Sequence, residues 1–238
     1  MDDRDFLLAA LARDTAAFTD LLRREDLDAP VPACPGWNLA DLGDHLGGIH
    51  GWAHGIVTTG SPGDAPTAPL RRDGLADWYA ERAADLVAAL TTAHPTNAVW
   101  TFGPPPRTVA FWVRRQPLET AVHLRDGRAT IGQTAPIDPA IAASGVDEVV
   151  TMMFPRQVRL ERIPPLGRGV RLVLTDRPGA SYLLAGDGLD PGAAYDATVR
   201  GTAEQVFLWL WRRIDTAELR VEGDAAAVAD VHATALTP

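Results

Sequence analysis

The spacing of the apolar residues changes once along the chain, near residue 153. Before that point apolar side chains recur at the intervals of amphipathic α-helices, whereas after it short alternating runs between glycine and proline are typical of β-strands. The predicted helices of the first part are residues 3–24, 39–57, 75–93, 108–130 and 138–153. The predicted strands are 170–175, 181–184, 195–199 and 218–222, with helices at 202–213 and 224–236.

Helices gathered before strands predict an α+β protein with two domains. We expect an N-terminal four-helix bundle over residues 1–153, with the helix at 138–153 as a linker, and a small C-terminal α+β domain over residues 154–238. A chain of 238 residues is long enough for two domains that each have a core.

Composition excludes several classes of function. The net charge of −9 argues against a general nucleic-acid-binding protein, because phosphate contacts need clustered positive charge. The chain has no lysine, which excludes Schiff-base chemistry, and its one cysteine, Cys34, excludes an internal disulfide and a multi-cysteine zinc site. The acidic N-terminus does not resemble a signal peptide, and no apolar run has the roughly 20 residues of a membrane helix, so we expect a cytoplasmic protein.

The helix at 39–57 carries three histidines in different phases. Its apolar stripe consists of Leu42, Leu46, Ile49, Trp52 and Ile56. At about 100° per residue, His45 falls inside this stripe, whereas His50 and His54 fall roughly 140–180° away from it. We therefore predict that His45 faces the core and that His50 and His54 face solvent.

Glu119 and His123 lie four residues apart in the helix at 108–130, so their side chains share one face. Trp112, Gln116 and Asp126 lie on the same face. Polar groups on an inward face are costly unless they are satisfied, which a metal ion or a polar network would do. If the two helices pack together, His45, Glu119 and His123 form a His/His/carboxylate set with open positions, as in catalytic zinc sites. The alternative is a hydrogen-bonded core histidine beside an ordinary helix pair.

Three segments resemble the mycothiol-dependent maleylpyruvate isomerase family, which belongs to the DinB-like group of metal-binding four-helix bundles. Residues 31–46 (VPACPGWNLADLGDHL) resemble the entry to its second helix, and residues 119–126 (ETAVHLRD) resemble its E-x-x-x-H segment. Residues 200–212 (RGTAEQVFLWLWR) look like the opening of a helix in its C-terminal domain. The resemblance follows nearly the whole chain in order.

The resemblance implies a zinc-type divalent ion held by His45, Glu119 and His123, and mycothiol as a low-molecular-weight thiol cofactor. In the isomerase, addition of the thiol to a cis double bond permits rotation to trans. A metal in such bundles can lower the pKa of a thiol and so supply the thiolate. A small-molecule substrate is implied, with no nucleic acid or membrane as partner.

Several functions stay open from the sequence. The first is a metal-dependent cis–trans isomerase or thiol S-transferase, and the second is a non-catalytic metal- or ligand-binding protein on the same scaffold. Metal-assisted hydrolysis is a third, with Asp126 as the nearest base. Arg82 and Arg200 are candidates for binding a substrate carboxylate. Cys34 precedes a helix, but a small buried residue in a turn is the preferred interpretation.

Overall fold

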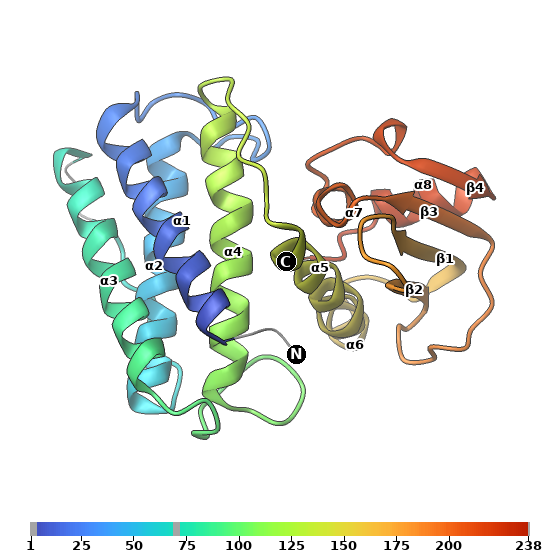
Figure 1. The fold of residues 1–238 in the computed structure, drawn as a ribbon, viewed down its shortest axis with the longest axis horizontal. Helices are drawn as coiled ribbons and strands as arrows, with labels where there is room; N and C mark the ends of the chain where they lie inside the picture. The colour runs from blue at the N-terminus through green and yellow to red at the C-terminus, as the bar shows by residue number, and fades with distance from the viewer. Residues whose placement is uncertain (1–3, 69–71, 238) are drawn as a thin grey trace. The chain divides into compact units, whose positions relative to one another are not determined.

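The computed structural model describes residues 4–68 and 72–237 and divides into two compact units, Met1–Pro136 and Ile137–Pro238. The first unit is built from long helices, and the second holds a sheet with shorter helices (Figure 1). This confirms the predicted α+β class, with helices preceding strands. Among the helices formed by the described residues, none has the length and hydropathy needed to cross a membrane.

The first unit is the predicted four-helix bundle. Its helices are α1 (Arg4–Arg24), α2 (Leu39–Thr59), α3 (Leu75–Thr92) and α4 (Val109–Ala129), with a short 3₁₀ turn, η1 (Arg72–Gly74), before α3. Helices α1 and α2 each pack against both α3 and α4. Helix α2 begins at a capping box between Asn38 and Asp41 and ends at Gly60 in the left-handed conformation. Both ends of α2 are therefore specified locally, which fixes the position of His45 along it.

Glycines decide which face of α2 is buried. A Cβ atom at Gly47 would lie 2.2 Å from the Trp78 ring of α3, so α2 and α3 approach each other where α2 has no side chains. His50 lies on this side of α2 and is fully buried, with 0% exposure. The prediction that His50 faces solvent is therefore wrong, because His50 follows Leu46 by four residues, which is about 40° around the helix, and so lies beside the apolar stripe rather than opposite it. His54 is partly buried.

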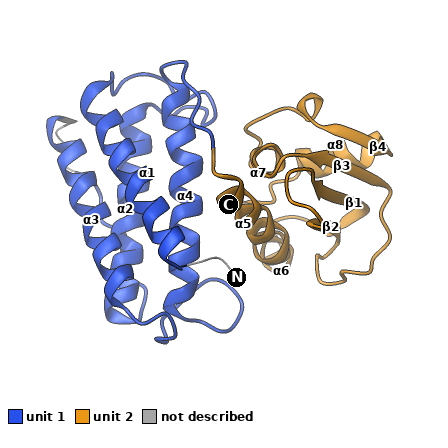
Figure 2. Cartoon of the chain, viewed as in Figure 1, with its two compact units in different colours: residues 1–136 blue, residues 137–238 orange. Residues whose placement is uncertain are grey.

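The second unit begins earlier than the boundary expected at residue 153. A nearly continuous helical segment consists of α5 (Pro139–Glu148), the π-helical turn η2 (Val149–Met153) and α6 (Phe154–Arg159). Helix α5 packs against α7 (Ala203–Leu210), and a Cβ atom at Gly145 would lie 2.3 Å from the Phe207 ring. The segment at 138–153 thus belongs to the compact unit that starts at Ile137 (Figure 2). Helical spacing predicts a helix but not the core against which it packs.

A mixed four-stranded sheet forms the centre of the second unit, in the order β2-β1-β3-β4. The strands are β1 (Leu166–Leu174), β2 (Ser181–Gly186), β3 (Ala197–Gly201) and β4 (Arg220–Gly223), and the last helix is α8 (Ala225–Ala233). Strand β1 pairs antiparallel with β2 and parallel with β3, and β3 pairs antiparallel with β4. All four strands overlap the runs predicted from alternation.

Candidate metal centre

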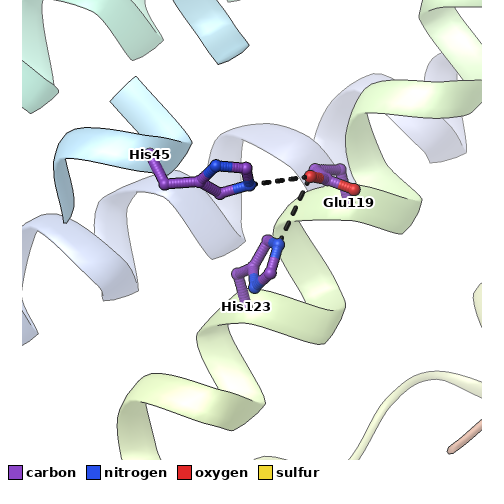
Figure 3. Close-up of side chains that lie close together, drawn as sticks. All are labelled: His45, Glu119 and His123. Carbon is purple, nitrogen blue, oxygen red and sulfur yellow. Dashed lines mark ion pairs between the residues drawn. The ribbon is translucent and has the colours of Figure 1, made fainter. Parts of the chain in front are cut away.

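Three side chains from α2 and α4 meet inside the bundle. His45 Nε2 lies 3.4 Å from Glu119 Oε1, and His123 Nε2 lies 3.3 Å from the same oxygen (Figure 3). One ligand atom from each residue lies within 4.8 Å of the other two. The structure therefore brings His45, Glu119 and His123 together, in agreement with the helical phases of the two segments.

Helix α4 supplies most of the centre because one of its faces is polar and buried. Glu119 and His123 are each 5% exposed, and Gln116 and Asp126 on the same side are buried as well. The side chain of His45 is 33% exposed, so the cluster meets solvent on its α2 side. Such an arrangement places the carboxylate in a poorly hydrated environment while leaving one edge accessible.

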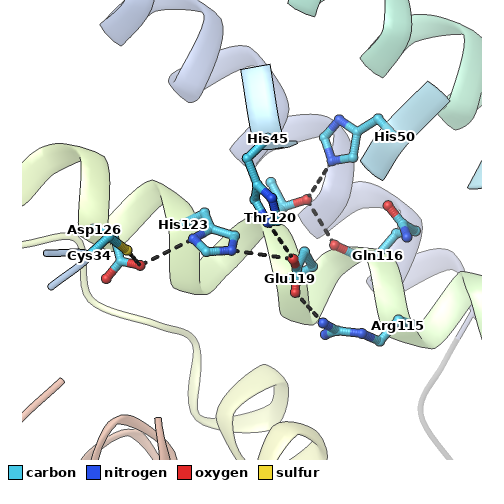
Figure 4. Close-up of polar contacts among 9 residues, drawn as sticks. All are labelled: Cys34, His45, His50, Arg115, Gln116, Glu119, Thr120, His123 and Asp126. Carbon is cyan, nitrogen blue, oxygen red and sulfur yellow. Dashed lines mark hydrogen bonds and ion pairs between the residues drawn. The ribbon is translucent and has the colours of Figure 1, made fainter. Parts of the chain in front are cut away.

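Two further residues of α4 fix the orientation of these groups (Figure 4). The Arg115 guanidinium donates to Glu119 Oε2, and Asp126 Oδ2 lies 3.2 Å from His123 Nδ1. A carboxylate on Nδ1 sets the ring orientation of a histidine whose Nε2 is free to bind a metal. The Cys34 thiol lies 3.8 Å from the same Asp126 oxygen. Sequence reasoning missed Arg115, although its position four residues before Glu119 is a recognisable signal for a helical ion pair.

The electrostatics of the centre are those of a charged cluster held in the interior. Burial alone would raise the pKa of Glu119, but the Arg115 and His123 charges and hydrogen bonds from both histidines hold it well below its usual range. Burial would lower the pKa of His123, yet the Glu119 charge and hydrogen bonds to Asp126 and Glu119 raise it to about 9. Without metal, His123 is therefore protonated at neutral pH, and a cation bound to Nε2 has to displace that proton.

The donor set fits a zinc-type ion. Ligands about 2.1 Å from a tetrahedral zinc ion are separated from one another by about 3.4 Å. The two separations to Glu119 Oε1, 3.4 and 3.3 Å, match this value. Two imidazole nitrogens and one carboxylate oxygen form a three-ligand set that leaves a coordination position for a further ligand.

The two arginines predicted to bind a carboxylate lie outside the cluster. Arg82 belongs to α3, where its guanidinium lies 2.7 Å from Glu81 and 3.3 Å from Asp85. Arg200 belongs to β3, and its Nε lies 3.5 Å from Glu222. Each is therefore partly neutralised by a carboxylate of its own unit.

His50 takes part in a separate buried contact beside the centre. Its Nε2 lies 3.1 Å from Thr120 Oγ1, which in turn donates to the Gln116 carbonyl oxygen at 2.8 Å. Burial lowers the pKa of His50 to about 3. The ring is therefore neutral in the folded protein at every pH at which metal binding is of interest.

The depressed pKa of His50 predicts an acid-sensitive contribution to stability. An unfolded histidine takes up a proton near pH 6.5 but folded His50 only near pH 3, so the unfolded state binds more protons between these values. This term stabilises the fold above pH 6.5 and is lost as the pH falls, by up to about 1.4 kcal/mol per pH unit. Urea unfolding of metal-free protein should accordingly show a shallower acid decline for His50→Gln than for wild type. Equal slopes for the two proteins would contradict this account of His50.

Comparisons with known proteins agree with this architecture. The family model for the mycothiol maleylpyruvate isomerase N-terminal domain matches residues 8–127, and the model for the C-terminal domain of that family matches residues 140–230. Two similar solved structures are those of a mycothiol-dependent maleylpyruvate isomerase and of a histidine-to-alanine mutant of such an enzyme. Their identities to this chain are 15% and 13% and their TM-scores 0.67 and 0.68, each covering 94% of this chain and 95% of the other. No curated protein sequence shows significant similarity. Because the two family models together span most of the chain, the protein belongs to the mycothiol maleylpyruvate isomerase family.

Proposed function

We propose that this protein is a metal-dependent enzyme that uses mycothiol, acting on a small unsaturated or electrophilic substrate as a cis–trans isomerase or an S-transferase. The observation that carries the proposal is the three-ligand cluster of His45, Glu119 and His123, found in a chain of this family. Two nitrogens and one carboxylate oxygen favour zinc as the ion. A divalent ion bound there would lower the pKa of a thiol and so supply a thiolate at neutral pH.

The residues of the chain have distinct roles in this proposal. His45 and His123 present imidazole Nε2 atoms and Glu119 presents Oε1, while Asp126 keeps the His123 ring in place through Nδ1. Burial of Glu119 and His123 excludes water from the α4 side. Addition of the thiolate to a double bond and its later elimination would regenerate the thiolate in an isomerase, whereas protonation of the adduct, with the carbon–sulfur bond retained, would make the protein a transferase.

We also keep Arg82 and Arg200 as proposed sites for a substrate carboxylate. Their side chains are 26% and 39% exposed, so each guanidinium has N–H groups within reach of solvent. A guanidinium can bind a carboxylate through two parallel hydrogen bonds, which suits an unsaturated diacid.

Metal analysis tests the first part of the proposal. Purified wild-type protein is expected to carry about one divalent ion per chain, whereas His45→Ala and His123→Ala should each lower the affinity for zinc by roughly 100-fold or more, because each removes one of three ligands. His54→Ala makes the same change on α2 outside the cluster and should bind metal like wild type. Absence of a stoichiometric divalent ion from wild type, with unchanged behaviour in the two ligand variants, would refute the site.

Turnover tests the second part. Metal-loaded protein is expected to convert a cis-unsaturated diacid, or to consume an electrophile, only when mycothiol is present, and the His123→Ala variant should not. A protein that binds metal at this cluster but shows no thiol-dependent turnover would be a binding protein rather than an enzyme, and the proposed activity would be wrong.

A further inference from the structure

The two carboxylate oxygens of Glu119 have different partners. Oε1 faces the imidazole nitrogens of His45 and His123, whereas Oε2 accepts from the Arg115 guanidinium one helical turn away (Figure 4). Arg115 is itself only 7% exposed, so this pair is shielded from solvent. A permanent cation is thus built into the centre, on the side of the carboxylate that faces away from the histidines.

The position of Arg115 determines how Glu119 can bind an ion. Because Arg115 engages Oε2, only Oε1 is directed toward the histidines, which favours binding through one oxygen. The guanidinium cannot lose its proton at any accessible pH, so this restriction is permanent. Arg115 therefore holds the orientation of the carboxylate and would limit the oxygen ligands that Glu119 offers to an ion.

The charge of Arg115 has a second consequence. Two neutral imidazoles and the carboxylates of Glu119 and Asp126 would carry a charge of about −2, and the guanidinium bonded to Glu119 brings the sum to about −1. Charges that are shielded from water interact strongly, so Arg115 opposes the approach of a divalent cation. In the metal-free protein, the same cation stabilises the buried Glu119 charge. Removal of Arg115 should therefore raise the free energy of the metal-free protein more than that of the metal-bound protein.

We propose that Arg115 is a positioning residue that competes with the metal for the charge of Glu119, keeping the carboxylate bound through one oxygen and the ion weakly held and electron-poor. This inference rests on the proposed function, because it assumes that a divalent ion binds at the cluster. An ion with less donated charge is a stronger Lewis acid toward a bound thiol. Arg115 thus lowers the affinity for the metal ion and makes the ion a stronger Lewis acid toward a ligand at its open coordination position.

The test compares Arg115→Met, which removes the charge, with Arg115→Lys, which retains it. Competition with a chromophoric chelator at neutral pH is expected to show zinc bound at least about tenfold more tightly by Arg115→Met, because the repelling cation is gone. Arg115→Lys should stay within about threefold of wild type, because its ammonium keeps the charge next to Glu119. Arg128→Met makes the same change further along α4 and should have no effect.

The visible spectrum of the Co²⁺-loaded protein reports the coordination of the ion, which would not change if Arg115 had a purely structural role. Wild type loaded with Co²⁺ should show the intense visible bands of four-coordinate cobalt, whereas Arg115→Met should show weaker bands, since Oε2 becomes free to bind as a fifth ligand. The metal-free Arg115→Met protein should unfold at a lower temperature than wild type, and metal should recover most of the difference. If Arg115→Met does not fold, Arg115→Gln removes the charge but retains a hydrogen-bond donor, so it gives the same comparison of zinc affinity, which alone then decides the outcome.

The outcomes separate this inference from the proposed function. Wild type that binds no divalent ion would overturn the proposed function. Wild type that binds metal, together with an Arg115→Met protein of equal or weaker affinity and unchanged cobalt bands, would overturn only the role assigned to Arg115.

Discussion

Replacement of Gly47 by alanine is expected to destabilise the bundle by about 2 kcal/mol, although alanine is the better helix former. The added Cβ atom would lie 2.2 and 2.8 Å from two carbon atoms of the Trp78 ring, closer than carbon atoms approach without displacement. Trp78 is packed against the core of the first unit, so the ring or the whole of α3 has to move. Urea unfolding should show a lower midpoint with little change in the denaturant dependence.

Gly55 provides the matched control on the same helix. A Cβ atom there would meet no atom within 4 Å. Gly55→Ala should therefore stabilise the protein by about 0.5–1 kcal/mol, because only the conformational cost of glycine is removed. If both substitutions shift the midpoint in the same direction, close approach of α2 and α3 at Gly47 is not what holds this face together.

The buried face of α2 is wider than the stripe of apolar residues in its sequence. Spacing of Leu42, Leu46 and Ile56 identifies one buried face correctly, and all three are fully buried. The solvent-facing prediction fails for His50, because this residue lies about 40° from Leu46 around the helix, at the edge of the same face, where Gly47 lets α3 approach. Contact with Trp78 depends on a residue about thirty positions away, and no local pattern in α2 contains that information.

The cluster, too, could be predicted from the sequence only in part. The four-residue spacing of Glu119 and His123 is a property of one helix, so their common face could be predicted from local sequence. The approach of His45 to Glu119 depends on packing between α2 and α4. Helical phase makes this approach plausible, and in the structure His45 Nε2 lies 3.4 Å from Glu119 Oε1. Arg115 was readable from its spacing but was overlooked, since an arginine in a helix is usually exposed. Helical spacing predicts a helix at residues 138–153, but it contains no information about which of the two units this helix packs against.

Replacement of Glu119 by glutamine is expected to have the largest effect of any single change at the centre. Glutamine has nearly the same shape but no charge, so Arg115 becomes a buried cation without its carboxylate partner. Breaking a buried pair from one side costs about 3–5 kcal/mol. Zinc should not bind measurably, because the sole anionic ligand of the set is lost, and the pKa of His123, about 9 in wild type, should fall without the Glu119 charge. NMR titration of the His123 ring and urea unfolding of metal-free protein measure the two effects.

Combining Glu119→Gln with Arg115→Met separates stability from metal binding. The double variant has neither charge of the buried pair, so it avoids the penalty that each single variant incurs, and at least half of the lost stability should return. Zinc binding should not return, because the carboxylate ligand is still absent. The two single variants are therefore predicted to be unstable for the same reason but to differ in metal affinity in opposite directions. Additive losses of stability in the double variant would show instead that Arg115 and Glu119 do not act as a pair, and the assignment of Arg115 as the counter-charge of the centre would have to be abandoned.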